Sequence, residues 1–192
     1  VWEDATTKYG FGHRRTYLLG KVLDSVMNYP FKNAVLDFVK GKPAEQAAGE
    51  ILSICEHYPA PALNTALNFL STHDTERALT VIADEPANGR GREWQSGRNV
   101  SGEAYEEGML RLRMAYAIIY TLPGLPCLYY GDEIGMQGYR DPFNRGYYCW
   151  DSHEERLKPV LAQLAHLRHS CEAFRTGALR VLRAEGGVLH YQ

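Results

Sequence analysis

The stretch ALNFLSTHDTER, residues 66–77, is the key to the fold class, because an apolar run of strand length passes directly into a polar segment. Two other apolar runs have strand length, at residues 22–29 and 125–130, and the second is followed by Gly131-Asp132-Glu133. Segments with helical periodicity separate these runs, in the order strand, helix, helix, strand, helix, strand, helix. This order predicts parallel strands joined by helical crossovers, and therefore an α/β fold.

The helical segments have recognisable starts and stops. We expect helices after Tyr29-Pro30 up to Gly41, over the apolar stripe 47–55 before Pro59, over residues 101–122, and from a capping pair of Ser152 and Glu155 onward. The third of these is apolar enough that we expect it to be buried on most sides. The polar stretch 84–102 is rich in glycine and arginine, which is typical of a mobile surface loop.

The end of the chain changes character. Residues 179–182 and 188–191 flank Glu185-Gly186-Gly187 and predict a β-hairpin. We therefore expect two parts: residues 1–175 in the α/β domain, and residues 176–192 as the beginning of a separate all-β domain.

Composition excludes several classes of protein. The chain has 192 residues, of which 45% are hydrophobic and 23% are charged, with a formal net charge of −2. These values are typical of a globular protein and give no support for a nucleic-acid or membrane-surface binder. The four cysteines form no CxxC pair and do not indicate a disulfide scaffold. The opening residues, VWED, show no secretory signal pattern; we leave the location open, with the cytoplasm favoured.

The polar groups after the apolar runs are the candidate functional residues, because chemistry in parallel α/β folds collects where strands end. His73-Asp74 alone is a weak signal, since Asp74 or Thr75 could simply cap the next helix. No set of ligands with metal-site spacing is evident, and a GxSxG nucleophile elbow is absent.

Four motifs together resemble the alpha-amylase family, glycoside hydrolase family 13. FLSTHDTER (69–77) resembles its fourth conserved region, GLPCLYYGDE (124–133) its eighth barrel strand, and DSVMNYP (24–30) its sixth strand. DPFNR (141–145), followed by Trp150, is similar to the segment after strand eight in neopullulanases, cyclomaltodextrinases and maltogenic amylases. The resemblance implies a partial (β/α)8 TIM barrel, about strands six to eight with their helices, followed by the first strands of a C-terminal β-domain.

The same resemblance implies that two catalytic carboxylates lie upstream. Val1-Trp2 matches the end of the Gly-Glu-[Val/Ile]-Trp pattern of strand five, so the acid/base glutamate would directly precede Val1. The nucleophilic aspartate belongs to strand four. We therefore expect the isolated chain to be inactive.

Site roles carried over from the family fall on six residues. Asp74 would be the third catalytic carboxylate, which stabilises the transition state, and His73 would donate to the same sugar. Trp2 would stack on a sugar and Tyr29 would lie nearby, with core packing the alternative for both.

Asp141 and Arg145 would form an ion pair at the glycone end of the cleft, with an ordinary surface salt bridge as the alternative. Asp132, Glu133 and Arg77 would instead fix the loops.

The function implied is that of a retaining hydrolase or transglycosylase acting on α-1,4-glucosidic bonds of starch, maltooligosaccharide, cyclodextrin or pullulan. The partner would be an alpha-glucan oligosaccharide, with no nucleic acid or membrane involved. No cofactor is expected, because no cluster of oxygen ligands supports calcium. A noncatalytic barrel relative and a carbohydrate-binding or interaction module stay open as alternatives. Open strand edges predict that the chain self-associates, and a homodimer stays open for the parent protein.

Overall fold

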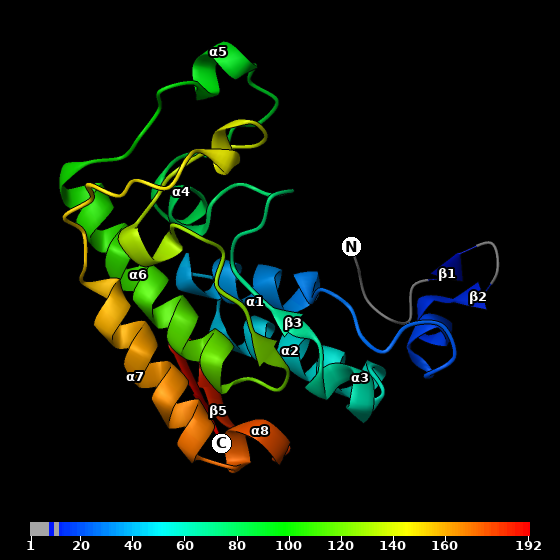
Figure 1. Ribbon diagram of the computed structural model, residues 1–192. Coiled ribbons are helices and arrows are strands. Elements are labelled where there is room, and N and C mark those ends of the chain that lie inside the picture. Colours follow the sequence, from blue (N-terminus) through cyan, green and yellow to red (C-terminus); the bar gives the residue numbers. More distant parts are fainter. Residues whose placement is uncertain (1–7, 10–11) are drawn as a thin grey trace.

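The computed structural model describes residues 8–9 and 12–192, with side chains described from Arg15 onward (Figure 1). In chain order the described elements are β1 (Lys8–Tyr9), β2 (Gly12–His13), η1 (Arg14–Leu18), α1 (Tyr29–Val39), α2 (Ala44–His57), α3 (Ala60–Asn64), β3 (Leu67–Asn68), α4 (Ala78–Ala83), α5 (Arg92–Gln95), α6 (Gly102–Thr121), β4 (Leu125–Pro126), η2 (Asp132–Ile134), η3 (Phe143–Arg145), α7 (Leu157–Ser170), α8 (Ala173–Thr176), β5 (Val181–Glu185) and β6 (Val188–Tyr191).

Parallel pairing of the three predicted strand segments is confirmed. β3 pairs in parallel with β4, with Leu67 opposite Leu125, and Met27 forms a parallel bridge to Leu67. The strands are much shorter than the apolar runs suggested. Residues 22–29 contribute only the bridge at Met27, because Val22 is exposed to solvent and Tyr29 is already the first residue of α1.

Two buried asparagines link the strand segments sideways. The Asn28 side-chain oxygen accepts a hydrogen bond from the Phe31 amide and so caps α1. Its side-chain nitrogen donates to Asn68 Oδ1 at 3.1 Å, and Asn68 Nδ2 donates to the Pro123 carbonyl at 2.6 Å. Since a buried carboxamide needs partners, this chain of bonds fixes the three segments relative to one another.

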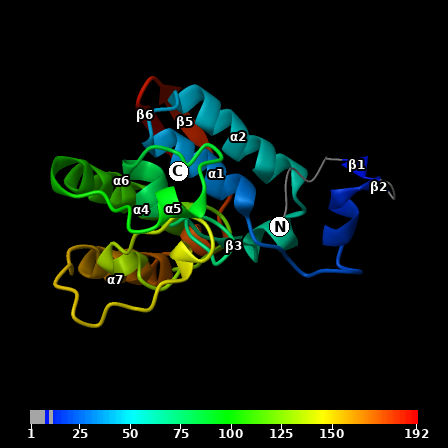
Figure 2. The same ribbon diagram turned by 90° about the horizontal axis from the view of Figure 1, so that it is seen from above.

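The core lies among the helices that connect the strands, and the four expected helices are all present. α1 packs on α2 and α6, and α6 packs on α4 and α7 (Figures 1 and 2). The expectation that α6 is buried on most sides is wrong: Leu110 is 66% exposed and Met114 is exposed as well. The predicted start of α7 is also wrong. Ser152 Oγ accepts from the Glu154 amide within a turn, and the helix begins only at Leu157.

The C-terminal hairpin is confirmed. β5 and β6 pair antiparallel around Gly186, which has a positive φ of 56° that favours glycine. The hairpin lies beside α2 (Figure 2), where Ala44 N donates to the Gly186 carbonyl at 2.7 Å. The assignment of residues 176–192 to a separate domain stays a prediction.

Apolar side chains of the short parallel strands remain in contact with solvent. Leu67 in β3 is 40% exposed and Leu125 in β4 is 47% exposed, although they lie opposite each other in the pairing. Within the described residues, the search for a helix long and apolar enough to cross a bilayer found none.

Candidate active site

The candidate site is built on the turn that follows β3. Ser71 Oγ accepts a hydrogen bond from the Ala78 amide at 2.8 Å, so Ser71 satisfies the start of α4. The Asp74 amide donates to Thr72 Oγ1 at 3.1 Å, which closes a tight turn before the helix. The alternative in which Asp74 or Thr75 caps this helix is therefore wrong, and the Asp74 carboxylate is left for another role.

Four predicted site residues come together here. Asp74 and His73 are 47% and 59% exposed, with 3.4 Å between Asp74 Oδ2 and His73 Nε2. Arg145 Nη2 lies 3.9 Å from Asp74 Oδ1, and Arg145 Nε lies 3.1 Å from Asp141 Oδ1. The expected ion pair between Asp141 and Arg145 is thus present, and the structure adds the approach of Arg145 to Asp74.

These ion pairs contribute little to stability. Both partners are about half exposed, and exposed pairs contribute about 0–1 kcal/mol. Asp74 and Arg145 consequently present charges and hydrogen-bonding atoms that a polar ligand can engage without breaking the fold.

The side chain of Asn144 holds this turn in place, although no role was predicted for Asn144 from the sequence. Its carboxamide nitrogen donates to the carbonyl oxygens of Thr72 at 3.2 Å, His73 at 2.9 Å and Thr75 at 2.8 Å. Arg145 Nε also donates to the His73 carbonyl at 3.0 Å. The only signal in the sequence was its place inside the DPFNR motif.

A buried charged cluster ties the same two loops together. Arg77 Nη1 donates to the Tyr130 carbonyl at 2.7 Å and to Asp132 Oδ1 at 3.3 Å, and the Arg77 guanidinium lies over the rings of Tyr129 and Tyr130. Tyr116 donates to the other Asp132 oxygen at 2.6 Å. Burial raises the pKa of Asp132 to about 6. The expected loop-fixing roles of Arg77 and Asp132 agree with these contacts.

Tyr29 lies in the core beside this cluster. Tyr29 is buried, its ring meets Phe69 edge-to-face at 4.8 Å, and its hydroxyl lies 3.4 Å from Thr72 Oγ1. This burial favours the core alternative for Tyr29, and its substrate-binding role stays a prediction. Trp2 lies outside the described residues.

The stretch 84–102 is mostly exposed, as expected of a surface loop, and it also carries a short helix and specific side-chain contacts. It contains α5. The guanidinium groups of Arg90 and Arg98 both lie over the Trp94 ring, at 4.4 and 4.3 Å from its centroid, and the ring meets Tyr139 edge-on at 5.2 Å. Arg98 also makes two hydrogen bonds to Asp84. Figure 1 shows α5 at the same end of the molecule as the yellow segment that contains η3.

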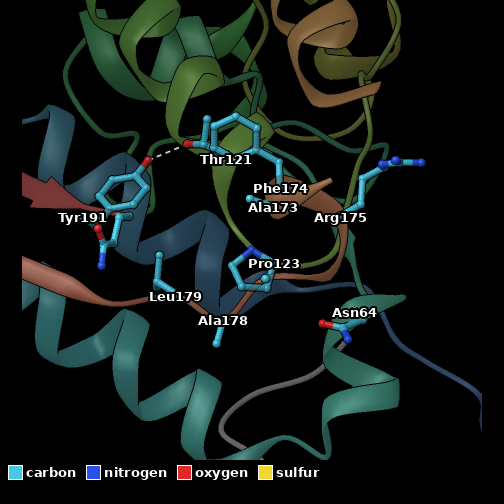
Figure 3. A pocket seen from close by; sticks show the side chains of 11 residues that line it. Asn64, Thr121, Pro123, Ala173, Phe174, Arg175, Ala178, Leu179 and Tyr191 are labelled. Atoms are coloured by element: carbon cyan, nitrogen blue, oxygen red, sulfur yellow. Dashed lines mark hydrogen bonds between the residues drawn. The ribbon is translucent and has the colours of Figure 1, made fainter. Parts of the chain in front are cut away.

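The pocket in Figure 3 is a different place. It has a volume of about 300 Å³ and lies where the chain enters β3 and β4, lined among others by Asn64, Pro123, Phe174, Leu179 and Tyr191. Of the predicted sugar-contacting residues that the structure describes (His73, Asp74, Tyr29, Asp141 and Arg145), none lines it. Among the described residues no group of three or more His, Cys, Asp or Glu side chains could hold a metal ion.

Parallel strands, crossover helices and polar side chains after the strands are features of parallel α/β proteins, and the α/β-barrel enzymes are one class of these. Residues 7–176 match the family model described as alpha amylase, catalytic domain, and the chain therefore belongs to the alpha-amylase family. This confirms the resemblance stated from the four motifs.

Named relatives agree with this membership. An amylopullulanase from Thermoanaerobacter thermohydrosulfuricus is 34% identical over 187 residues, covering 89% of this chain and 12% of that protein. A cyclomaltodextrinase from Bacillus sp is 34% identical over 173 residues, covering 88% of this chain and 27% of that protein. The type III pullulan hydrolase from Thermococcus kodakarensis superposes with a TM-score of 0.77 at 28% identity, covering 92% of this chain and 29% of that one. The chain thus spans less than a third of each of these proteins.

Proposed function

We propose that this chain is the C-terminal part of the catalytic barrel of a retaining alpha-glucan hydrolase or transglycosylase, about strands six to eight, and that residues 176–192 begin a C-terminal β-domain. The whole protein cleaves α-1,4-glucosidic bonds of starch, maltooligosaccharide, cyclodextrin or pullulan. The names of the relatives support an enzyme over a noncatalytic relative.

The observation that carries the proposal is the placement of Asp74. Its carboxylate is half exposed just beyond the carboxyl end of β3, next to His73 and Arg145, and no backbone amide of α4 uses it. Active sites of α/β barrels lie at this end of the strands. A carboxylate that capped α4 would instead accept hydrogen bonds from the backbone amides at the start of that helix.

The chemistry needs Asp74 as a hydrogen-bond acceptor. In retaining glycosidases one carboxylate attacks the sugar and another protonates the leaving group, around an oxocarbenium-like transition state. Asp74 accepts hydrogen bonds from ring hydroxyls of the reacting sugar, and His73 donates to the same sugar. These charge-assisted hydrogen bonds strengthen as the sugar ring flattens toward the transition state. They therefore lower the activation free energy of bond cleavage without tightening the binding of the unreacted substrate.

The test is Asp74→Asn in the full-length protein that carries this chain, with maltotriose and cyclodextrin as substrates. We expect kcat to fall about 10²–10³-fold or more, because an interaction made mainly in the transition state is lost. Glu76→Gln is the matched control: Glu76 lies 3.7 Å from Arg140, and its loss should leave kcat within about twofold. Undiminished turnover by the Asp74 variant would refute the proposal.

The proposal also implies that the 192-residue chain alone has no hydrolase activity, because nucleophile and acid/base would lie outside it. Release of reducing sugar from maltotriose by the purified chain would contradict this.

A further inference from the structure

Asn144 makes an unusual set of contacts for a buried side chain. It lies in η3, is fully buried, and points its carboxamide nitrogen at three backbone carbonyls that precede it by 69 to 72 residues. A carboxamide has only two N–H groups, so two of the three carbonyls share one hydrogen. The side chain therefore gives its whole donor capacity to one turn.

This arrangement leaves the other half of the carboxamide without a partner. Asn144 Oδ1 is buried and accepts no hydrogen bond from the described residues. An unsatisfied buried acceptor costs about 1–3 kcal/mol. The contacts of Asn144 thus favour the geometry of the turn over full hydrogen bonding of its own side chain.

The three carbonyls enclose Asp74. Those of Thr72 and His73 precede it, and that of Thr75 follows it, so one atom of Asn144 anchors the peptide group directly before Asp74 and the peptide group that follows Thr75. The Asp74 amide is itself bonded to Thr72 Oγ1. Backbone freedom at Asp74 is therefore controlled by a residue that belongs to the next strand–loop unit of the fold.

We propose that Asn144 is a positioning residue for the Asp74 carboxylate, and that it acts on catalysis only through Asp74. The inference rests on the proposed function of Asp74. Loss of the clamp lets the turn shift, and a displacement near 1 Å at a reacting centre can cost about 10²-fold in rate. Substrate contacts made elsewhere are unchanged, so the loss falls on kcat.

The test uses Asn144→Asp in the full-length protein, because aspartate has the same shape but its carboxylate cannot donate. We expect kcat to fall about 10–100-fold with KM within about threefold. The kcat of Asn144→Ser, which keeps one donor, should lie between those of Asn144→Asp and the wild type. This variant replaces Asn144→Asp in the test if Asn144→Asp does not fold.

Arg168→Met is the matched control. Arg168 is also buried and donates to three backbone carbonyls, those of Tyr120, Leu122 and Gly124, but at the entrance to β4 instead of at the site. Its loss should lower Tm as the Asn144 variants do and leave kcat within about twofold at temperatures where the protein is folded. If Arg168→Met and Asn144→Asp lose kcat equally, the effect of Asn144→Asp comes from a general loss of folding, and the inference is overturned.

A double-mutant cycle separates this inference from the function on which it rests. If Asn144 acts through Asp74, adding Asn144→Asp to the Asp74→Asn variant should reduce the residual kcat by less than about twofold. A further loss of tenfold or more would show a role independent of Asp74. If Asp74→Asn itself keeps full activity, the proposed function fails; if only Asn144→Asp keeps full kcat, the positioning role alone fails.

Discussion

At the scale of single residues, Asp132 shows two opposing forces at one carboxyl group. It is buried beneath the candidate site, which disfavours its charged form, while Arg77 and the Tyr116 hydroxyl favour that form. Burial wins, and the pKa rises from its usual 3.8 to about 6. The neighbouring Tyr116 hydroxyl also has its pKa raised well above the usual value, first by burial and then by Asp132.

A pH dependence of stability follows from Asp132. The folded-state pKa lies above the unfolded value, so protonation of Asp132 favours folding below about pH 4, and this contribution is lost as the pH rises through about 6. Asp132→Asn does not titrate. We therefore expect Asp132→Asn to gain stability relative to the wild type as the pH rises from 4 to 7, measured by urea unfolding at each pH.

A change of relative stability in the opposite direction would show that the charge of Arg77, and not burial, dominates at Asp132. If Asp132→Asn loses stability relative to the wild type over this pH range, the Arg77 charge outweighs burial and the pKa is lowered instead. The Asp141→Asn variant is a suitable control, because Asp141 is exposed and pairs only with the exposed Arg145 in the described contacts.

At the scale of elements, the stretch that contains α5 gains its order from one tryptophan. Trp94 lies under the guanidinium groups of Arg90 and Arg98 and meets Tyr139 edge-on, and each such contact contributes about 0.5–1 kcal/mol. We expect Trp94→Ala to increase trypsin cleavage after Arg90 and Arg92 by roughly tenfold, since local opening exposes these bonds.

Trp150→Ala is the control for this experiment. Trp150 is exposed and contacts Tyr148 instead of α5, so its loss should leave the cleavage rate unchanged. Equal cleavage of the wild type and the Trp94 variant would mean that Trp94 does not order the stretch.

The elements also show where sequence reasoning works. Helices α1, α2 and α6 follow from apolar periodicity with proline and glycine stops, because these signals are local. Strand lengths could not be predicted, since the ends of a strand depend on pairing with a neighbour. α5 was missed because its order depends on Tyr139, a residue of a later loop.

The candidate site divides in the same way. His73, Asp74, Asp141 and Arg145 were all found from their motifs, and the structure brings them together. Asn144 was not found, because its three acceptors are backbone carbonyls, which no residue type announces. Tyr29 was predicted to end a strand, whereas it is the first residue of α1, because the apolar run alone does not show where the strand stops.

At the scale of the whole molecule, the exposed strand leucines predict association between copies. Leu67 and Leu125 expose apolar surface on neighbouring strands, and burial of such surface contributes about 25 cal/mol per Å². We expect the isolated chain to form dimers or larger species as its concentration rises, measured by light scattering. Replacing both leucines by serine should weaken association about tenfold or more.

Leu110→Ser provides the control for the association experiment. Leu110 is also strongly exposed, but it lies on α6 and away from the strand pairing. If this variant weakens association as much as the double strand variant does, contact occurs through the helices. A monomer at every concentration would contradict the prediction.

The hydrogen bonds from Asn144 to the turn after β3 do not depend on which side chains the turn carries, because their acceptors are main-chain oxygens. Substitutions at position 75 therefore leave its carbonyl available to Asn144, whereas a substitution at position 72 also removes the hydroxyl that accepts from the Asp74 amide, and one at position 144 removes the donor itself. A chimera that takes its β3 loop from one parent and its β4 loop from another should retain a well-held carboxylate whenever the second parent supplies a donor at position 144. Such an exchange also has to keep the pair of Arg77 and Asp132, because that pair joins the same two loops through side chains.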